Sequence, residues 1–294
     1  METVPVYSDS GRRYDVGLIQ DRWFMGKVRG AAQYVPLYDQ RYQGVIADNV
    51  VDRIANEWDC IIQCTGKRRT GKSTNAASIA RIIDANFPVG NVSFTIDSFN
   101  ELLSSLPYAN VPEGIIPQAL YDESGHGLFS QNWMERVQKN LVKKLEVIGM
   151  KNLTVWLVLP HRKKLNKSIR EEMVHYWIHT TTFEKRRGLA EVRIGLENIW
   201  EEEMYWAPLA AYTFDSMAET KWWAGYTDVK RAFVDEIADD PLDDIKGSGA
   251  ITQRNNAIAL VYRMTGLSHG EIAKELELPR GTINTILRGI SKRH

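Results

Sequence analysis

The segment Gly66-Lys67-Arg68-Arg69-Thr70-Gly71-Lys72-Ser73 places the strongest constraint on how this chain folds. It fits the pattern G-x-x-x-x-G-K-[ST] at every required position. Residues 60–64 before it read as a short buried strand, and residues 73–86 after it carry apolar side chains at helical spacing. A strand, a glycine loop and a helix are the context that the pattern requires, which disfavours a chance glycine turn. We therefore predict an α/β fold, with a parallel sheet flanked by helices.

The chemistry of this loop suits a phosphate group. Glycine lets backbone N–H groups curl around an anion, and the helix N-terminus adds a partial positive charge. Lys72 is predicted to reach the β- and γ-phosphates of a nucleotide, and the Ser73 hydroxyl to bind Mg²⁺. ATP and Mg²⁺ are therefore the expected cofactors. The predicted nucleotide-binding residues are Gly66, Lys67, Arg68, Arg69, Thr70, Gly71, Lys72, Ser73 and Thr74.

A second segment, Gln118-Ala119-Leu120-Tyr121-Asp122-Glu123, reads as a short buried strand that ends in two carboxylates. Asp122 is predicted to hold the metal together with Ser73. Glu123 is predicted to orient and deprotonate the attacking water. Adjacent acidic residues are common at strand ends, so this interpretation depends on the glycine loop that precedes it.

Residues 153–159 form a continuous apolar run that is typical of a central strand in a parallel sheet. His161 follows this strand, at a point where similar motor ATPases carry a polar residue that senses the γ-phosphate. This similarity makes His161 the candidate sensor, with a solvent-facing strand end as the alternative. The basic segment 163–173 follows. It is a solvated face, a contact to a DNA backbone, or the source of an arginine finger that acts on a neighbouring subunit. Arg162 and Arg170 are the candidate fingers.

Other elements are assigned from apolar spacing. Residues 46–58 and 130–148 are predicted helices, and Gly149 ends the second. Strands are predicted at 91–96, 176–184 and 190–198. A short helix that runs to Leu106 is predicted to be capped by Asp97 or Ser98.

Two aromatic-rich regions have no clear period. Residues 1–45 are interpreted, with the helix that follows, as an N-terminal extension (1–55) that wraps the core or reaches a neighbouring subunit. Residues 199–226 are dense in tryptophan and tyrosine. They are interpreted as a second core or a subunit contact in preference to a surface that stacks on bases.

Composition and charge exclude several classes of protein. Hydrophobic residues make up 44% and charged residues 25%, the balance of an ordinary globular protein. No apolar run reaches the roughly 18 residues of a membrane span, and no apolar core follows Met1 as in a signal peptide. Cys60 and Cys64 lie too far apart on one predicted strand for a disulfide, so both are expected to be buried thiols in a reducing cytoplasm, the host's if the protein is viral.

The C-terminal segment differs from the rest in charge. Residues 235–244 hold six acidic and no basic side chains, and we interpret 236–250 as a linker that follows a catalytic domain over 56–235. Residues 246–294 then carry eight Lys and Arg against three Glu.

This basic segment, 251–294, is predicted to form three helices. A capping box at Ser268–Glu271 opens the second, which packs Ile272, Ala273 and Leu276 inward. Polar and Arg side chains would face outward from the third helix and suit a DNA major groove. A three-helix protein-binding module is the alternative. The candidate DNA-binding residues are Arg280, Thr282, Asn284, Thr285 and Arg288.

The pairing of 66–73 with Asp122-Glu123 resembles the P-loop NTPases of the RecA-like type whose catalytic glutamate lies on the Walker B strand. Over residues 55–200 the chain is most similar to the FtsK–HerA family of DNA-pumping motors. The variable loop residues Lys67-Arg68-Arg69 are also similar to those of phage terminase motors. The family commonly ends its sensor strand with Gln, whereas this chain has Leu159-Pro160-His161. Residues 267–289 resemble helix-turn-helix domains of the sigma-factor region 4 and resolvase types.

The resemblance implies an ATP-hydrolysing DNA translocase, or a genome-packaging ATPase of a virus or mobile element, with a DNA-binding tail. It implies double-stranded DNA as a partner, a homo-oligomeric ring, a possible portal or loader protein, and a Walker B strand that is not adjacent to the loop strand. The alternative is an ATP-dependent regulator or loader that switches on nucleotide without moving along DNA. A small-molecule kinase is disfavoured by Asp122-Glu123 and by the basic tail.

Overall fold

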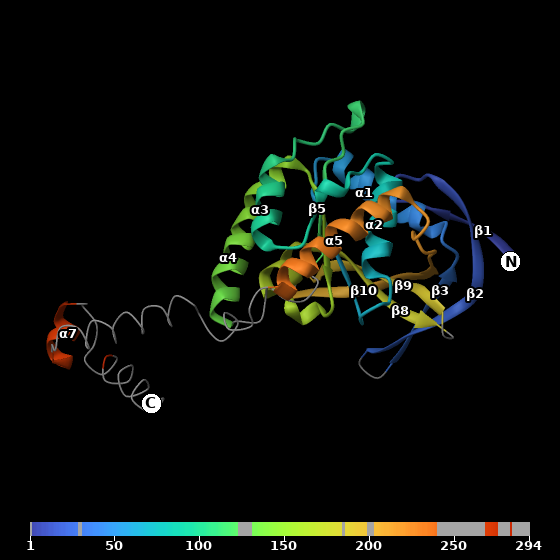
Figure 1. The fold of residues 1–294 in the computed structure, drawn as a ribbon. Coiled ribbons are helices and arrows are strands. Elements are labelled where there is room, and N and C mark those ends of the chain that lie inside the picture. The colour runs from blue at the N-terminus through green and yellow to red at the C-terminus, as the bar shows by residue number, and fades with distance from the viewer. Residues whose placement is uncertain are drawn as a thin grey trace. The chain divides into compact units, whose positions relative to one another are not determined.

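The computed structural model describes residues 2–28, 31–122, 131–183, 186–198, 203–239, 268–275 and 283. The chain divides into two compact units, Met1–Val234 and Asp235–His294. The described part of the first unit is built on one ten-stranded mixed sheet with helices on its faces, which confirms the predicted α/β class (Figure 1).

The strand order is β1-β2-β3-β10-β9-β8-β4-β7-β6-β5. Strands β5, β6, β7, β4 and β8 pair in parallel, whereas β8, β9 and β10 pair antiparallel. Strand β3 pairs in parallel with β10 and carries the β1–β2 hairpin to the far edge. The strands are β1 (Glu2–Tyr7), β2 (Arg13–Val28), β3 (Ala31–Tyr38), β4 (Cys60–Gly66), β5 (Val92–Ser93), β6 (Gln118–Asp122), β7 (Thr154–Leu159), β8 (Val174–Phe183), β9 (Arg186–Asn198) and β10 (Glu203–Thr213).

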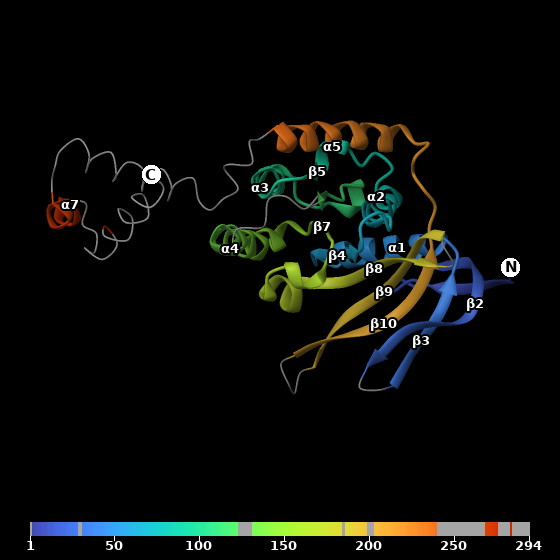
Figure 2. The same cartoon turned by 60° about the horizontal axis from the view of Figure 1, so that its bottom comes forward.

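The helices cover both faces of the parallel half of the sheet (Figure 2). Helices α1 and α2 pack on one face and α3 and α4 on the other, because their apolar stripes join two separate buried clusters. The helices are α1 (Tyr42–Ala55), α2 (Lys72–Ile83), α3 (Ile96–Ser105), α4 (Gln131–Ile148) and α5 (Lys221–Asp239). Short 3₁₀ and π turns are η1 (Val89–Asn91), η2 (Val111–Glu113), η3 (Gly149–Lys151), η4 (Arg162–Lys164) and η5 (Ile169–Met173).

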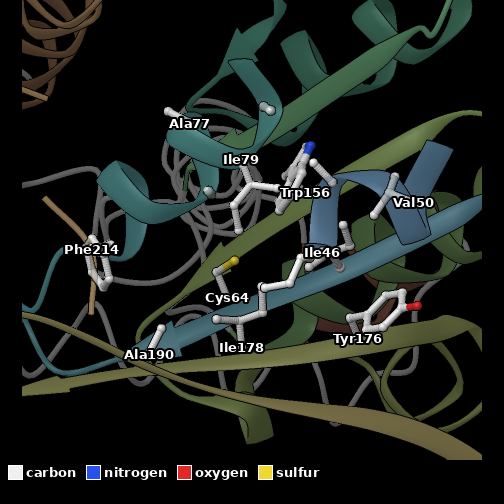
Figure 3. Close-up of a cluster of buried hydrophobic side chains, with 14 of the residues drawn as sticks. Ile46, Val50, Cys64, Ala77, Ile79, Trp156, Tyr176, Ile178, Ala190 and Phe214 are labelled. Atoms are coloured by element: carbon white, nitrogen blue, oxygen red, sulfur yellow. The ribbon is translucent and has the colours of Figure 1, made fainter. Parts of the chain in front are cut away.

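The larger core lies between α1, α2 and the sheet. Side chains from α1, α2, β4, β7 and β8 converge there, with Trp156 fully buried among them (Figure 3). Strand β7 is buried along its whole length between β4 and β6, as its apolar run predicted. Cys60 and Cys64 are both buried free thiols, which confirms that part of the prediction.

The aromatic N-terminal region is part of the sheet. The segment that had no assigned structure forms strands β1 to β3, and the helix that follows is α1. Tyr42 of α1 stacks on Tyr38 of β3 at 5.0 Å between ring centroids, and this contact joins the added strands to the core.

Three details of the sequence prediction change. The residue that caps α3 is Thr95, whose side chain accepts a hydrogen bond from the Ser98 backbone N–H, and not Asp97 or Ser98. The strand predicted over 91–96 is limited to β5, because α3 already begins at Ile96. The predicted strand at 190–198 begins four residues earlier, at Arg186.

In the second unit the structure describes α7 (His269–Glu275). The predicted capping box is present: the Ser268 N–H donates to Glu271 Oε2 at 2.7 Å, and the Glu271 N–H donates to Ser268 Oγ at 3.3 Å. Ile272, Ala273 and Ile283 are buried, as expected for inward-facing positions.

Among the helices described here, none has the length and apolar character needed to cross a membrane.

Candidate functional site

The candidate site lies at the carboxyl ends of four parallel strands. Strands β6, β7, β4 and β8 are neighbours in that order, so their C-terminal residues meet at one edge of the sheet. Strand β7 separates β6 from β4, as predicted. The edge therefore brings together the glycine loop after β4, Asp122 at the end of β6 and His161 after β7.

The two motif glycines occupy positions that other residues fit poorly. Gly66 has φ +148°, and a Cβ there would lie 2.3 Å from the Thr180 carbonyl oxygen of β8. Gly71 has φ +89°, and a Cβ there would lie 2.8 Å from the Phe214 ring. Both the backbone conformation and the neighbouring atoms therefore require glycine.

Hydrogen bonds to β8 fix the loop. Thr70 is buried, and its hydroxyl lies 2.9 Å from the Lys67 carbonyl and 2.8 Å from the Thr180 hydroxyl. Lys67, Arg68 and Arg69 between them are exposed. The loop thus presents three basic side chains to solvent, while Thr70 attaches its backbone to Thr180 of β8.

Lys72, Ser73 and Asp122 lie close together. Ser73 Oγ donates to Asp122 Oδ2 at 3.0 Å, and Lys72 Nζ donates to the Lys67 carbonyl at 2.8 Å. Burial lowers the pKa of Lys72, the Asp122 charge raises it, and the charge of Lys230 lowers it again. The predicted pair Ser73 and Asp122 is therefore brought into contact by the fold.

Helix α5 contributes two site residues that the sequence analysis did not identify. The Tyr226 hydroxyl donates to Asp122 Oδ2, and Lys230 Nζ forms an ion pair with the same oxygen at 2.6 Å. Asp122 is 3% exposed, whereas the Lys230 side chain keeps 31% exposure, so the carboxylate is buried and the ammonium is partly open to water. Burial, followed by the Asp122 charge, raises the pKa of Tyr226. In the sequence, Tyr226 ends the aromatic segment 199–226, which was interpreted as a second core or a subunit contact, and Lys230 lies four residues beyond it.

His161 is exposed after β7 and is the N-cap residue of η4. A second histidine, His179 of β8, lies nearer the loop strand: its Nδ1 is 2.9 Å from the Thr65 hydroxyl, and that hydroxyl also accepts from Trp177 Nε1 at 2.7 Å. Burial, then the charges of Arg193, His161 and Lys72, lower the pKa of His179. The fold therefore adds a second histidine near the predicted sensor.

The two candidate arginine fingers have different surroundings. The Arg162 guanidinium stacks over Trp206 at 4.5 Å and Trp177 at 5.1 Å. Burial, followed by the Arg170 charge, lowers its pKa to about 10. Arg170 lies on η5 and pairs with Glu171 at 2.6 Å. Arg162 is therefore held by aromatic packing within its own chain, whereas Arg170, whose side chain is 19% exposed, is held by an ion pair with Glu171.

Several predicted residues lie outside the described residues. They are Glu123 and the tail positions Arg280, Thr282, Asn284, Thr285 and Arg288.

The residues at this edge fit a magnesium ion. A serine hydroxyl and a carboxylate are the hard oxygen ligands that Mg²⁺ prefers, and it usually completes its shell with water and substrate phosphates. No cluster of three or more His, Cys, Asp or Glu side chains suited to a metal occurs in the described part of the chain. Ser73 and Asp122 could therefore supply two of the oxygen ligands of such an ion.

No protein-family model matches the chain, and no curated protein is similar to it in sequence. Its function has to be inferred from the site.

Proposed function

We propose that this protein binds and hydrolyses ATP at the 66–73 loop, as a P-loop NTPase of the catalytic-glutamate type. The observation that carries the proposal is the contact between Ser73 Oγ and Asp122 Oδ2, the two residues that the sequence predicts as joint metal ligands. The order of the strands supports the proposal further, because β7 lies between β4 and β6.

The residues divide the chemistry between them. The N-terminus of α2 and the loop N–H groups bind the phosphates, and Lys72 stabilises the charge that develops on them. Ser73 and Asp122 hold Mg²⁺, which offsets phosphate charge when it is bound. Glu123, the residue after Asp122, aligns the attacking water and accepts its proton.

We further propose that hydrolysis drives movement of double-stranded DNA, in a translocase or packaging ATPase that works as a homo-oligomeric ring. The residue pattern of 55–200 and the basic segment 251–294 support this assignment. Arg170 is the better candidate for a finger acting on the next subunit, because Arg162 is enclosed by Trp177 and Trp206.

The decisive experiment compares ATP hydrolysis with and without duplex DNA and measures the mass of the assembly by light scattering. A motor should hydrolyse ATP faster on DNA and form a ring, and tracking of single molecules on long duplex should show processive movement. DNA-stimulated hydrolysis without movement would instead favour a loader or regulator. Failure to bind or hydrolyse ATP would refute the proposal.

A further inference from the structure

Asp122 has more hydrogen-bond donors on one oxygen than that oxygen can serve well. Oδ2 receives Ser73 Oγ, the Tyr226 hydroxyl and Lys230 Nζ. A carboxylate oxygen offers two lone pairs, so Oδ2 is saturated by side chains of its own chain. A cation that binds between Ser73 and this oxygen must first displace one of the three.

Lys230 is the donor that competes most directly with a cation. Its ammonium carries a full charge, lies 2.6 Å from Oδ2 and retains 31% exposure of the side chain. Nζ also contacts the Tyr226 hydroxyl at 2.8 Å and lies 5.8 Å from the centre of the Phe94 ring. The ammonium can therefore leave Asp122 for water without the rest of the site unfolding.

Helix α5 is anchored differently at its two ends. Near its start, Trp222 Nε1 donates to the Phe87 carbonyl at 2.7 Å and its ring stacks on Phe87. Beyond Lys230, Phe233 stacks on Phe94, but the neighbouring Arg231 and Val234 are exposed. Trp222 thus holds the first turns, and among the described side chains of 227–235 Lys230 and Phe233 contact other elements.

We propose that Lys230 is a positioning residue that competes with Mg²⁺ for Asp122, so that loading the site with metal and nucleotide releases the later turns of α5. The inference rests on the proposed function. Helix α5 continues past Val234 to Asp239, so the released turns include the first residues of the second unit.

The test measures ADP binding by fluorescence at increasing Mg²⁺ in the full chain. Lys230→Met keeps an aliphatic side chain but removes the charge. In this variant the Mg²⁺ concentration that gives half-maximal ADP binding should fall by about tenfold, which corresponds to the free energy of one charged hydrogen bond. Lys230→Arg should stay close to wild type. Arg231→Met is the matched control, because Arg231 is 75% exposed and pairs only loosely with Asp228.

Hydrogen exchange gives a second readout that does not depend on activity. In the wild type, Mg²⁺ and ADP together should speed amide exchange over 227–234, and in Lys230→Met exchange there should be fast already. Equal Mg²⁺ midpoints in wild type and Lys230→Met, with ADP still bound by both, would overturn this inference but leave the proposed function intact. A drop in ADP affinity at every Mg²⁺ concentration would also overturn it, since Lys230 would then be a phosphate ligand. Lack of ADP binding by the wild type would instead refute the proposed function.

Discussion

Ser73 Oγ lies 3.0 Å from Asp122 Oδ2, although the two residues are 49 positions apart in the sequence. One residue belongs to the first turn of α2 and the other ends β6, and strand β7 lies between their strands. The parallel sheet therefore brings together two side-chain oxygens that neither local segment could place side by side alone.

Removing the charge of Asp122 should weaken metal binding while keeping the shape of the site. Asp122→Asn is expected to raise the Mg²⁺ requirement for ADP binding by at least about tenfold, because a neutral amide is a poorer ligand for a hard cation. Fluorescence titration at fixed ADP measures this. Asp97→Asn, at an exposed acidic position of α3, is the control and should titrate like the wild type.

Lys72 and Glu123 are expected to act at different stages of the reaction. Lys72→Ala should weaken both nucleotide binding and turnover, since it removes the positive lysine charge that stabilises the negative phosphates. Glu123→Gln should bind ATP normally but lose turnover by roughly 10²-fold or more, as when a general base is removed. Steady-state hydrolysis and equilibrium binding separate the two effects. Wild-type turnover in Glu123→Gln would show that Glu123 is not the base.

Gly71 should not tolerate a side chain. Gly71→Ala places a Cβ 2.8 Å from the Phe214 ring on a backbone with φ +89°, so the loop must shift. We expect nucleotide affinity to fall at least about tenfold and the free energy of unfolding to fall by about 1–3 kcal/mol. Gly90→Ala is the matched control, because a Cβ there meets no atom within 4 Å. Equal effects of the two substitutions would contradict the geometry of the loop.

Acid should destabilise the fold through His175. This histidine accepts a hydrogen bond from the Ile61 N–H at 3.0 Å, and burial lowers its pKa to about 3. At pH values below the unfolded-state pKa near 6.5, only the unfolded chain takes up the proton. The free energy of unfolding therefore decreases as the pH is lowered, until the folded-state pKa is reached. The lowered pKa of His179 acts in the same direction.

The measurement is urea unfolding at several pH values between about 6 and 5. In His175→Asn, whose amide oxygen can still accept from Ile61, the decline should be shallower by roughly 1.4 kcal/mol per pH unit, the contribution of one proton. An unchanged slope in this variant would mean that His175 is not the group responsible.

Local patterns predicted the parts of the fold that depend on local chemistry. The glycine loop, the apolar run of β7 and the capping box at Ser268–Glu271 each carry their signal within a few residues. The cap of α3 was assigned to the wrong residue because Thr95, Asp97 and Ser98 are all good N-caps, and only the backbone decides between them.

The parts that were missed depend on distant contacts or on broken periodicity. Strands β2 and β3 have register shifts at Leu18/Gln20, Gln20/Trp23 and Phe24/Gly26, and such bulges erase the alternation that identifies a strand. The Tyr226 and Lys230 contacts to Asp122 span more than a hundred positions, so no window around α5 reveals them. Aromatic packing around Trp222 explained the composition of this segment equally well.

The basic tail should bind DNA independently of catalysis. The chain is neutral overall, yet residues 246–294 carry eight Lys and Arg against three Glu after an acidic segment. A chain cut after Ile245 keeps the glycine loop, Asp122 and α5, so its basal ATP hydrolysis should be unchanged. Its affinity for duplex DNA should fall, and the salt dependence of binding should become shallower by the phosphate contacts that are lost. Filter binding over a range of salt measures both.

Single substitutions in the tail test how it reads DNA. If Arg280 and Asn284 contact base edges, replacing either by Ala should cost about 1–3 kcal/mol on a preferred site and little on random duplex. A preferred site can be obtained by selection from random duplexes with the full chain. An equal loss on both kinds of DNA would make the tail a non-specific clamp. No loss on either, with the truncated chain binding as before, would mean that the tail binds a protein, such as a portal or loader.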